Sequence, residues 1–193
     1  MKIYGSMASP YVRRLRILLA NTEHELVVVN LFGKERAELK KVNPTLKIPM
    51  FEDTAKPETP MLFDSGLIYR YLVDTYDFPS LTLAEQNLLV AIDACSDSLV
   101  NMLIMTRSDI DTNEDKLYFK VQRERQKVTF DLLEQELING NFTKWNYLTI
   151  SLVVLVEWAQ FRNLYDFSSY PNICEFVAIS QDQDGVAATK PQD

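Results

Sequence analysis

The feature that most constrains the fold is a change of pattern near residue 80. Before it, short apolar runs typical of strands alternate with helical stretches, whereas after it every apolar stripe has the spacing of a helix. Two patterns in succession favour two domains. We therefore predict an α/β domain over residues 1–77, a linker over 78–82, an all-α domain over 83–180 and a polar, disordered tail over 181–193.

The first domain is predicted to have the element order βαβαββα, which implies a small mixed sheet flanked by helices. Strand patterns occupy residues 2–5 and 25–30, and the second is so continuously apolar that we expect it to be covered on both faces. Residues 48–52 and 60–64 flank a turn-rich segment and form a hairpin candidate. Helical patterns fill the intervals, one beginning at Pro10 and the others over residues 34–42 and 66–76.

The second domain opens with a capping box, because Thr82 and Glu85 have the spacing at which each side chain can bond a backbone amide of the other. Later in this domain, Asn146 can cap a helix that is apolar nearly all round over residues 148–156. A helix without a polar face is predicted to be the buried centre of its domain.

Composition and charge narrow the class of protein. The 193 residues are 47% hydrophobic and 24% charged, as in soluble globular proteins. The longest apolar run, residues 152–156, is far shorter than the roughly 18 residues of a membrane span. With no apolar signal segment after Met1, we expect a cytoplasmic protein that does not contact membranes. Residues 78–193 hold 9 Lys and Arg against 17 Asp and Glu, which disfavours nucleic-acid binding.

Cysteine and histidine are too sparse for a metal site. Cys95 and Cys174 lie far apart in apolar helical surroundings, so we expect two small buried side chains rather than a disulfide. The single histidine, His24, is expected in a surface turn. We therefore predict that no metal is bound.

A helix start at Ser9-Pro10 is the first candidate for chemistry. Proline is tolerated at the first helical position, and a preceding serine caps the free amides. The same free amides and the helix dipole can hold an anion or a thiolate. Ser9 is thus either a cap alone or a cap with chemistry. Three arginines that follow are expected to form mainly a solvated face: Arg13, Arg14 and Arg16.

Two more stretches could bind a ligand, K-I-P at 47–49 and F-D-S-G at 63–66. A proline at a strand start can hold a cis peptide bond and leave the preceding backbone groups free to pair with an extended peptide. Asp64 could hold an ammonium group, and Ser65 with nearby amides a carboxylate. Asp64 and Ser65 could also be a plain helix start. A thiol-bearing peptide with an amino-acid-like head would span all three stretches.

In this order the stretches resemble the glutathione transferase family, over Met1 to about Ile179. S-P-Y-V-R-R matches the active-site segment of bacterial serine-type, theta- or zeta-like members. N-P-T-L-K-I-P matches the family's N-P-x-G-K-V-P, and F-D-S its acidic residue-serine pair. The resemblance implies an amino-terminal thioredoxin-like domain of order βαβαββα and an all-α carboxy-terminal helical bundle.

It also implies roles for individual residues. Ser9 would donate a hydrogen bond to the glutathione sulfur, and Ile48, before a cis Pro49, would pair its backbone with the cysteinyl part. Asp64 and Ser65 would bind the γ-glutamyl end. The implied contacts with glutathione, the co-substrate, are Ser9, Lys47, Ile48, Pro49, Asp64 and Ser65. The family further implies a homodimer that detoxifies an electrophile held near Met102 and Met105.

Alternatives stay open. The chain could be a non-catalytic interaction protein like stringent starvation protein A, or a glutathione-dependent isomerase or reductase. It also departs from the family pattern in two places. Leu46 stands where a glycine is common, and Asn146 with Thr149 replaces the usual S/T-x-x-D cap, which we expect to weaken that cap by about 1 kcal/mol.

Overall fold

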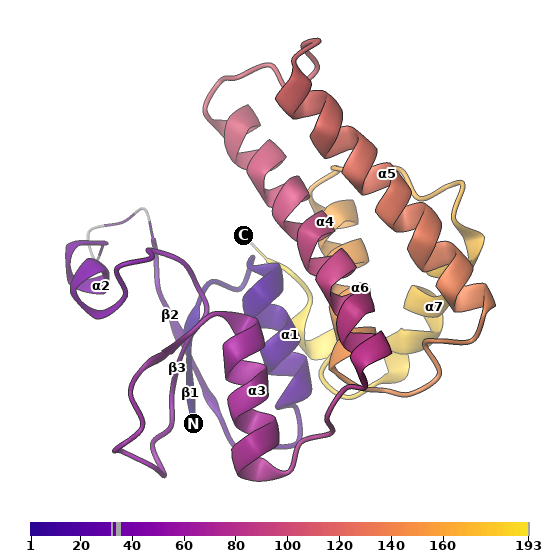
Figure 1. The fold of residues 1–193 in the computed structure, drawn as a ribbon. Coiled ribbons are helices and arrows are strands. Elements are labelled where there is room, and N and C mark those ends of the chain that lie inside the picture. The colour runs from indigo at the N-terminus through magenta and orange to yellow at the C-terminus, as the bar shows by residue number, and fades with distance from the viewer. Residues whose placement is uncertain (32, 34–35, 193) are drawn as a thin grey trace. The chain divides into compact units, whose positions relative to one another are not determined.

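The computed structural model describes residues 1–31, 33 and 36–192 (Figure 1). The chain divides into two compact units. The first comprises Met1–Ser80 together with Asp182–Asp193, and the second comprises Leu81–Gln181. The division between Ser80 and Leu81 lies inside the segment 78–82 that the sequence analysis assigned to a linker.

The first unit contains a four-stranded mixed sheet in the order β2-β1-β3-β4. β1 pairs in parallel with β2, and antiparallel pairs join β1 to β3 and β3 to β4. This arrangement confirms the predicted βαβαββα order and the thioredoxin-like fold class. The elements are β1 (Lys2–Gly5), α1 (Pro10–Leu18), β2 (Glu25–Val28), α2 (Arg36–Val42), β3 (Met50–Glu52), β4 (Leu62–Phe63) and α3 (Ser65–Tyr76).

The strand β2 differs from the prediction. It lies at the edge of the sheet, and its last residue, Val28, is 63% exposed. None of the residues of α2, the next helix along the chain, is buried, so this helix gives β2 little cover. The expected burial on both faces is therefore wrong. Residues 34 and 35, the start of the helix predicted over 34–42, lie outside the described residues.

The second unit is built from helices, which confirms the predicted all-α half (Figure 1). Its centre is α6, in which every residue from Tyr147 to Val156 is buried. A helix with no polar face can be stable in water only where neighbours cover it, and α4 and α7 both pack on α6. The helices are α4 (Leu83–Arg107), α5 (Leu117–Ile138), α6 (Tyr147–Phe161) and α7 (Pro171–Ile179).

The cap of α6 is complete, with Asn146 and Thr149 in place of the usual S/T-x-x-D pair. The Asn146 side-chain oxygen accepts from the amides of Leu148 and Thr149 at 3.0 and 3.2 Å, and the Thr149 hydroxyl accepts from the Asn146 amide at 2.9 Å. A threonine hydroxyl thus takes the place of the carboxylate. Asn146 also donates to Glu85 at 2.8 Å. Burial acts to raise the pKa of Glu85, but hydrogen bonds from Thr82 and Asn146 outweigh it and lower that pKa.

The carboxy-terminal segment is folded over its described residues 181–192, where the sequence analysis expected a disordered tail over 181–193. Two short 3₁₀ helices, Ser180–Asp182 and Ala187–Thr189, form part of it. Val186 is fully buried, and the segment from Asp182 onward belongs to the first unit. The polar composition concealed this outcome, because a single buried valine and a few hydrogen bonds suffice to hold the segment.

Two expectations about apolar residues need adjustment. Averaged over 18 residues, α4 is apolar enough and long enough to cross a membrane, although core helices of soluble proteins meet the same criterion. Cys95 is fully buried as predicted, and burial raises the pKa of its thiol to about 12. Cys174 is only half-buried, and both cysteines are free thiols.

Candidate functional site

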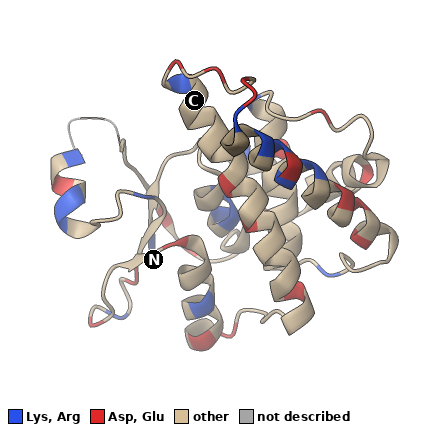
Figure 2. Ribbon diagram, turned by 45° about the horizontal axis from the view of Figure 1, so that its top comes forward, with Lys and Arg blue, Asp and Glu red and all other residues tan. Residues whose placement is uncertain are grey.

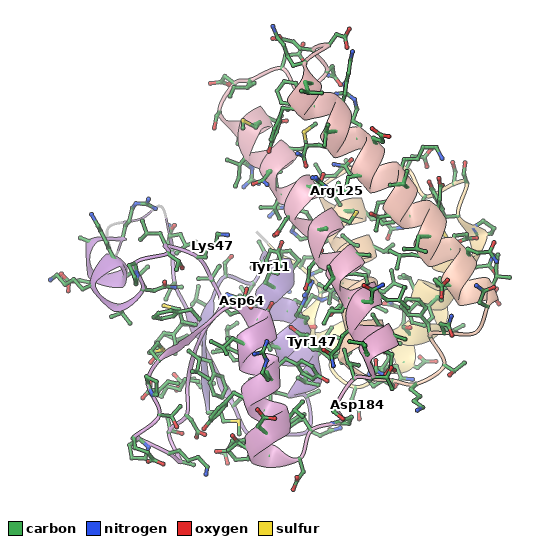
Figure 3. All side chains as sticks on the ribbon, viewed as in Figure 1. Tyr11, Lys47, Asp64, Arg125, Tyr147 and Asp184 are labelled. Atoms are coloured by element: carbon green, nitrogen blue, oxygen red, sulfur yellow. The ribbon has the colours of Figure 1, made fainter. Side chains whose placement is uncertain are left out.

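The register of the sheet brings the three predicted stretches to one end of the first unit. β3 is antiparallel to β1 and begins at Met50, opposite Tyr4. β4 is antiparallel to β3, and its last residue, Phe63, lies opposite Met50. The segment after β1, the segment before β3 and the segment after β4 therefore meet at the same end of the sheet. Figure 3 shows Tyr11, Lys47 and Asp64 at this end.

The width of this end suits an extended tripeptide. Adjacent strands lie about 4.8 Å apart, so β1, β3 and β4 together span about 10 Å. Three residues of extended chain also span about 10 Å. A ligand of that length could contact all three stretches at once.

Ser9 lies at the start of α1 and makes one weak hydrogen bond to the helix. Its backbone is extended (φ −83°, ψ 125°), and its hydroxyl accepts from the Val12 amide at 3.4 Å, near the limit of a hydrogen bond. The side chain is half-exposed. The hydroxyl hydrogen is not used in this bond. Ser9 can therefore donate to an anion while its oxygen still caps the helix.

The stretch 47–49 has the geometry that the sequence predicts. The Ile48–Pro49 peptide bond is cis. Pro49 is buried at the entry to β3, Ile48 is half-buried and Lys47 is exposed. Leu46, at the position where the family commonly has glycine, adopts a left-handed conformation with φ 53°. The loop thus keeps a backbone suited to glycine with a leucine in place.

Asn43 organises this loop, and the sequence analysis assigned it no role. Its side chain is 2% exposed and donates to the Lys47 carbonyl at 2.8 Å. Its oxygen accepts from the amide and the hydroxyl of Thr45 at 3.0 and 2.6 Å. Asn43 thereby fixes the backbone immediately before Ile48. The Asn-Pro pair at 43–44 is a turn signal from which such a role could have been predicted.

Asp64 and Ser65 form the start of α3. One oxygen of Asp64 accepts from the amides of Gly66 and Leu67 at 2.8 and 3.2 Å. The residue itself is exposed and has φ 74°. Its other oxygen takes no part in this cap and could meet a cation. Ser65 is 4% exposed, so a ligand would reach little of its side chain.

The arginines of α1 are not a solvated face, which corrects that prediction for two of them. Arg13 and Arg14 are each 1% exposed. The guanidinium of Arg14 lies 5.2 Å from the centre of the Tyr11 ring, within range of a cation–π contact. Long arginine stems can pack as apolar groups, a property that charge counting overlooks. Arg16 is half-buried, and burial followed by repulsion from Arg13 lowers its pKa.

A buried carboxylate ties α3 to the β3–β4 connection. Asp53 is 2% exposed and accepts from the hydroxyls of Tyr71 and Tyr76 at 2.7 and 2.5 Å. Burial alone would raise the pKa of Asp53, but the hydrogen bonds from Tyr76 and Tyr71 outweigh it and lower that pKa. The same contact raises the pKa of Tyr76 to about 12. Among the described residues, no group of three His, Cys, Asp or Glu side chains could hold a metal.

Comparison with known proteins agrees with this geometry. Residues 3–80 match the family model described as the N-terminal domain of glutathione S-transferase. The uncharacterized GST-like protein YibF of Escherichia coli (strain K12) is 27% identical over 175 residues, which cover 85% of this chain and 84% of that protein.

Two solved structures share the fold over nearly their whole length. A glutathione transferase family member from Pseudomonas fluorescens Pf-5, with bound glutathione, is 22% identical with a TM-score of 0.84, covering 100% of this chain and 99% of that one. A bacterial maleyl pyruvate isomerase of the Zeta class is 22% identical with a TM-score of 0.75, covering 99% and 97%. This chain is therefore similar to glutathione S-transferases in its amino-terminal domain, and the two solved structures share its fold.

Proposed function

We propose that the protein binds reduced glutathione at the end of the sheet where Ser9, Ile48 and Asp64 meet, and transfers it to an electrophile. The observation that carries the proposal is the strand register, which brings three separate sequence stretches to one end of the sheet. Bound glutathione in a structure of the same fold supports the choice of ligand. The proposed contacts are Ser9, Lys47, Ile48, Pro49, Asp64 and Ser65.

The proposed role of Ser9 is to stabilise the thiolate. A free thiol has a pKa of about 8.5, so it is mostly protonated at neutral pH, and the thiolate is the nucleophile. The Ser9 hydroxyl would donate a hydrogen bond to the sulfur, and the start of α1 would favour its negative charge. The thiol proton would leave to solvent. Ser9 would remain chemically unchanged, because the sulfur of glutathione forms the new bond to carbon. An aryl halide would lose halide to solvent, and an epoxide would open its C–O bond and take a proton from solvent.

The other contacts would hold the peptide. The backbone of Ile48, fixed by the Asn43 contact with Lys47, would pair with the cysteinyl part as one strand pairs with another. The free oxygen of Asp64 would meet the ammonium of the γ-glutamyl end. We place this activity in the cytoplasm, as a detoxification of electrophiles.

Two other functions fit parts of the same geometry. A glutathione-dependent isomerase is favoured by the fold shared with the Zeta-class maleyl pyruvate isomerase. A non-catalytic interaction protein like stringent starvation protein A would need no intact peptide site, and the arrangement around Ser9 speaks against it. A reductase that forms a mixed disulfide with its own cysteine is disfavoured, because position 9 is a serine.

Calorimetric titration with reduced glutathione is the first test. Asp64→Asn removes the charge that would meet the ammonium, while an asparagine oxygen can still cap α3 and tolerates a positive φ. We expect saturable binding by the wild type and at least tenfold weaker binding by this variant. Asp74→Asn, an exposed position on the same helix, is the matched control. Absence of binding at millimolar glutathione would overturn the proposal.

A second measurement separates transferase from isomerase. The wild type and Ser9→Ala would be assayed with aryl halides, epoxides and cis-enediacids, with thioether formation and cis–trans conversion followed separately. We expect thioether products, with turnover lowered about a hundredfold in Ser9→Ala while glutathione still binds. Exclusive conversion of cis-enediacids would instead establish the isomerase.

We further propose a homodimer formed through α5. Leu117, Val121, Val128 and Leu132 are all exposed and recur at spacings of four and seven, so they share one face of the helix. Figure 2 shows basic residues mainly in the first half of α5 and acidic residues in the second. Two copies of α5 packed antiparallel would therefore set opposite charges together under a two-fold axis.

Light scattering tests this interface. We expect a dimer for the wild type and a monomer for Val128→Glu, because a carboxylate would be buried in an apolar contact. Val28→Glu, at an equally exposed valine of β2, is the control and should remain dimeric. A dimer that survives Val128→Glu would exclude this face.

A further inference from the structure

The carboxy-terminal segment is bonded to the helix that carries Ser9. Arg13 lies one turn after Ser9, and its backbone amide donates to the Ser9 carbonyl at 3.1 Å. Its guanidinium donates to the Val186 carbonyl at 3.1 Å and to the Thr189 hydroxyl at 3.3 Å. A single residue therefore connects the backbone of Ser9 with a segment more than 170 residues later. In Figure 1 this yellow segment runs beside α1.

A second contact lies near the other end of α1. Gly185 has φ 81°, and a Cβ added to it would lie only 2.8 Å from the Cβ of Ala20 and 3.3 Å from the Cα of Ile17. Only glycine allows the two backbones to approach so closely. Next to it, the Asn21 side chain donates to Asp184 at 2.8 Å. The segment thus holds α1 both in its middle and just beyond its end.

Internal contacts stabilise the segment itself. The Thr189 hydroxyl donates to the Gly185 carbonyl at 2.7 Å, which closes a loop around the fully buried Val186. Arg13 is 1% exposed, and a buried guanidinium is costly without acceptors. The segment supplies two of its acceptors. Loss of the segment would therefore remove two acceptors from a buried guanidinium of α1.

We propose that residues 184–189 form a strap that sets the position of α1, and that Arg13 is a positioning residue for Ser9. The proposal rests on the proposed function, in which Ser9 holds the glutathione thiolate. The first turn of α1 is already pressed against β1, since a Cβ at Gly5 would lie 2.3 Å from a methyl carbon of Val12. Between this contact and the strap, α1 has little room to shift. A displacement of about 1 Å would take the Ser9 hydroxyl out of hydrogen-bond range of a bound sulfur.

Two glycines offer a matched test in the full-length protein. Gly185→Ala and Gly140→Ala both place alanine at a positive φ, 81° and 78° respectively, but a Cβ at Gly140 meets nothing within 4 Å. Only Gly185→Ala therefore pushes the strap away from α1. Thr189→Val is a milder second variant, which keeps the shape of the side chain and removes an acceptor of Arg13. It decides the question if Gly185→Ala fails to fold.

The first readout is amide hydrogen exchange over residues 10–18, which needs no ligand. We expect exchange there to be at least fivefold faster in Gly185→Ala and Thr189→Val, and within twofold of the wild type in Gly140→Ala. Unchanged exchange in both strap variants would overturn the claim that the strap holds α1.

The second readout is the affinity for glutathione and the pKa of its bound thiol, followed by thiolate absorbance at saturating glutathione. We expect at least fivefold weaker binding and a raised thiol pKa in the strap variants only. A merely structural strap would lower thermal stability without moving that pKa, and this result would overturn the role of Arg13. A wild type that binds no glutathione would overturn the proposed function and the role of Ser9, whereas the exchange data would still decide whether the strap holds α1.

Discussion

The start of α1 and the start of α6 are both capped by a small polar side chain, yet they differ in how fully that side chain is used. Asn146 is buried and makes hydrogen bonds to two amides and to Glu85, while Thr149 returns a bond to its backbone. Ser9 is half-exposed and has one bond of 3.4 Å. A capping side chain whose polar atoms all form internal hydrogen bonds stabilises the fold. A capping side chain with a single weak hydrogen bond can still bond to a ligand.

The same difference separates two aspartates of the first unit. Asp53 is buried and accepts from Tyr71 and Tyr76, so its carboxylate is committed to the packing of α3. Asp64 is exposed, and only one of its oxygens is used. In this protein, burial and the number of internal hydrogen bonds, rather than residue type, thus distinguish structural polar groups from those that a ligand can reach.

The largest effect on stability is expected from Asn146→Ala. This change removes the buried α6 cap and the part-buried contact with Glu85, and should lower the free energy of unfolding by about 2 kcal/mol. For a chain of this size the midpoint of thermal unfolding would fall by about 6 °C. Asn139→Ala, at an exposed position after α5, is the control. A decrease in the free energy of unfolding of less than about 0.5 kcal/mol would show that Asn146 contributes no more to stability than Ser9.

Asp53→Asn is expected to cost about 1.5 kcal/mol at pH 7, because it weakens two hydrogen bonds to a charged acceptor. The pKa of Asp53 is lower in the folded protein than in the unfolded chain, where it is about 3.9. Its contribution is therefore present above about pH 4 and is lost as the pH falls through the folded-state pKa.

Urea unfolding of wild type and Asp53→Asn at several pH values measures this difference. The two stabilities should converge as the pH falls from about 4 through the folded-state pKa of Asp53. A gap that stays constant from pH 7 to pH 3 would mean that the charge of Asp53 does not contribute.

The fold could be predicted from the sequence where local patterns decide structure. The change of pattern near residue 80, the Thr82 capping box and the Pro10 helix start all depend on neighbours in the chain. Arg13 and the segment 184–189 could not be predicted, because their burial depends on contacts between opposite ends of the chain. A polar segment is predicted to be disordered when the residues that bury it are not known from the sequence.

The candidate site divides in the same way. Its residue types and order were visible in three short stretches, but the meeting of those stretches follows from strand register, which pairs Tyr4 with Met50 and Met50 with Phe63. The Asn-Pro pair at 43–44 indicates the local role of Asn43 as a turn residue, but it does not indicate that Asn43 is buried. Its hydrogen bond to the Lys47 carbonyl is local, yet its burial at 2% depends on the folded unit around it.

A smaller effect is expected at Leu46, whose φ of 53° marks a strained point in the candidate site. The Leu46→Gly variant should be more stable than Leu46→Ala by about 1 kcal/mol, since a Cβ is unfavourable in the left-handed region. In the last turn of α3, the Asp74→Ala variant should instead be more stable than Asp74→Gly, by up to about 1 kcal/mol. Urea unfolding of the four variants measures both differences. Equal stabilities of Leu46→Gly and Leu46→Ala would show that the loop relaxes without cost.

The smallest effect on stability is expected from Ser9→Ala, at about 0.5 kcal/mol, because its cap bond is long and half-exposed. Urea unfolding beside Asn146→Ala measures the contrast directly. Glutathione at about 100 times its Kd should raise the free energy of unfolding of the wild type by about 2.7 kcal/mol. The increase should be smaller for Ser9→Ala if the sulfur loses a donor. The gap between the two proteins should therefore widen when the ligand is present. A Ser9→Ala cost that equals that of Asn146→Ala, with no widening, would mean that the hydroxyl serves the helix alone.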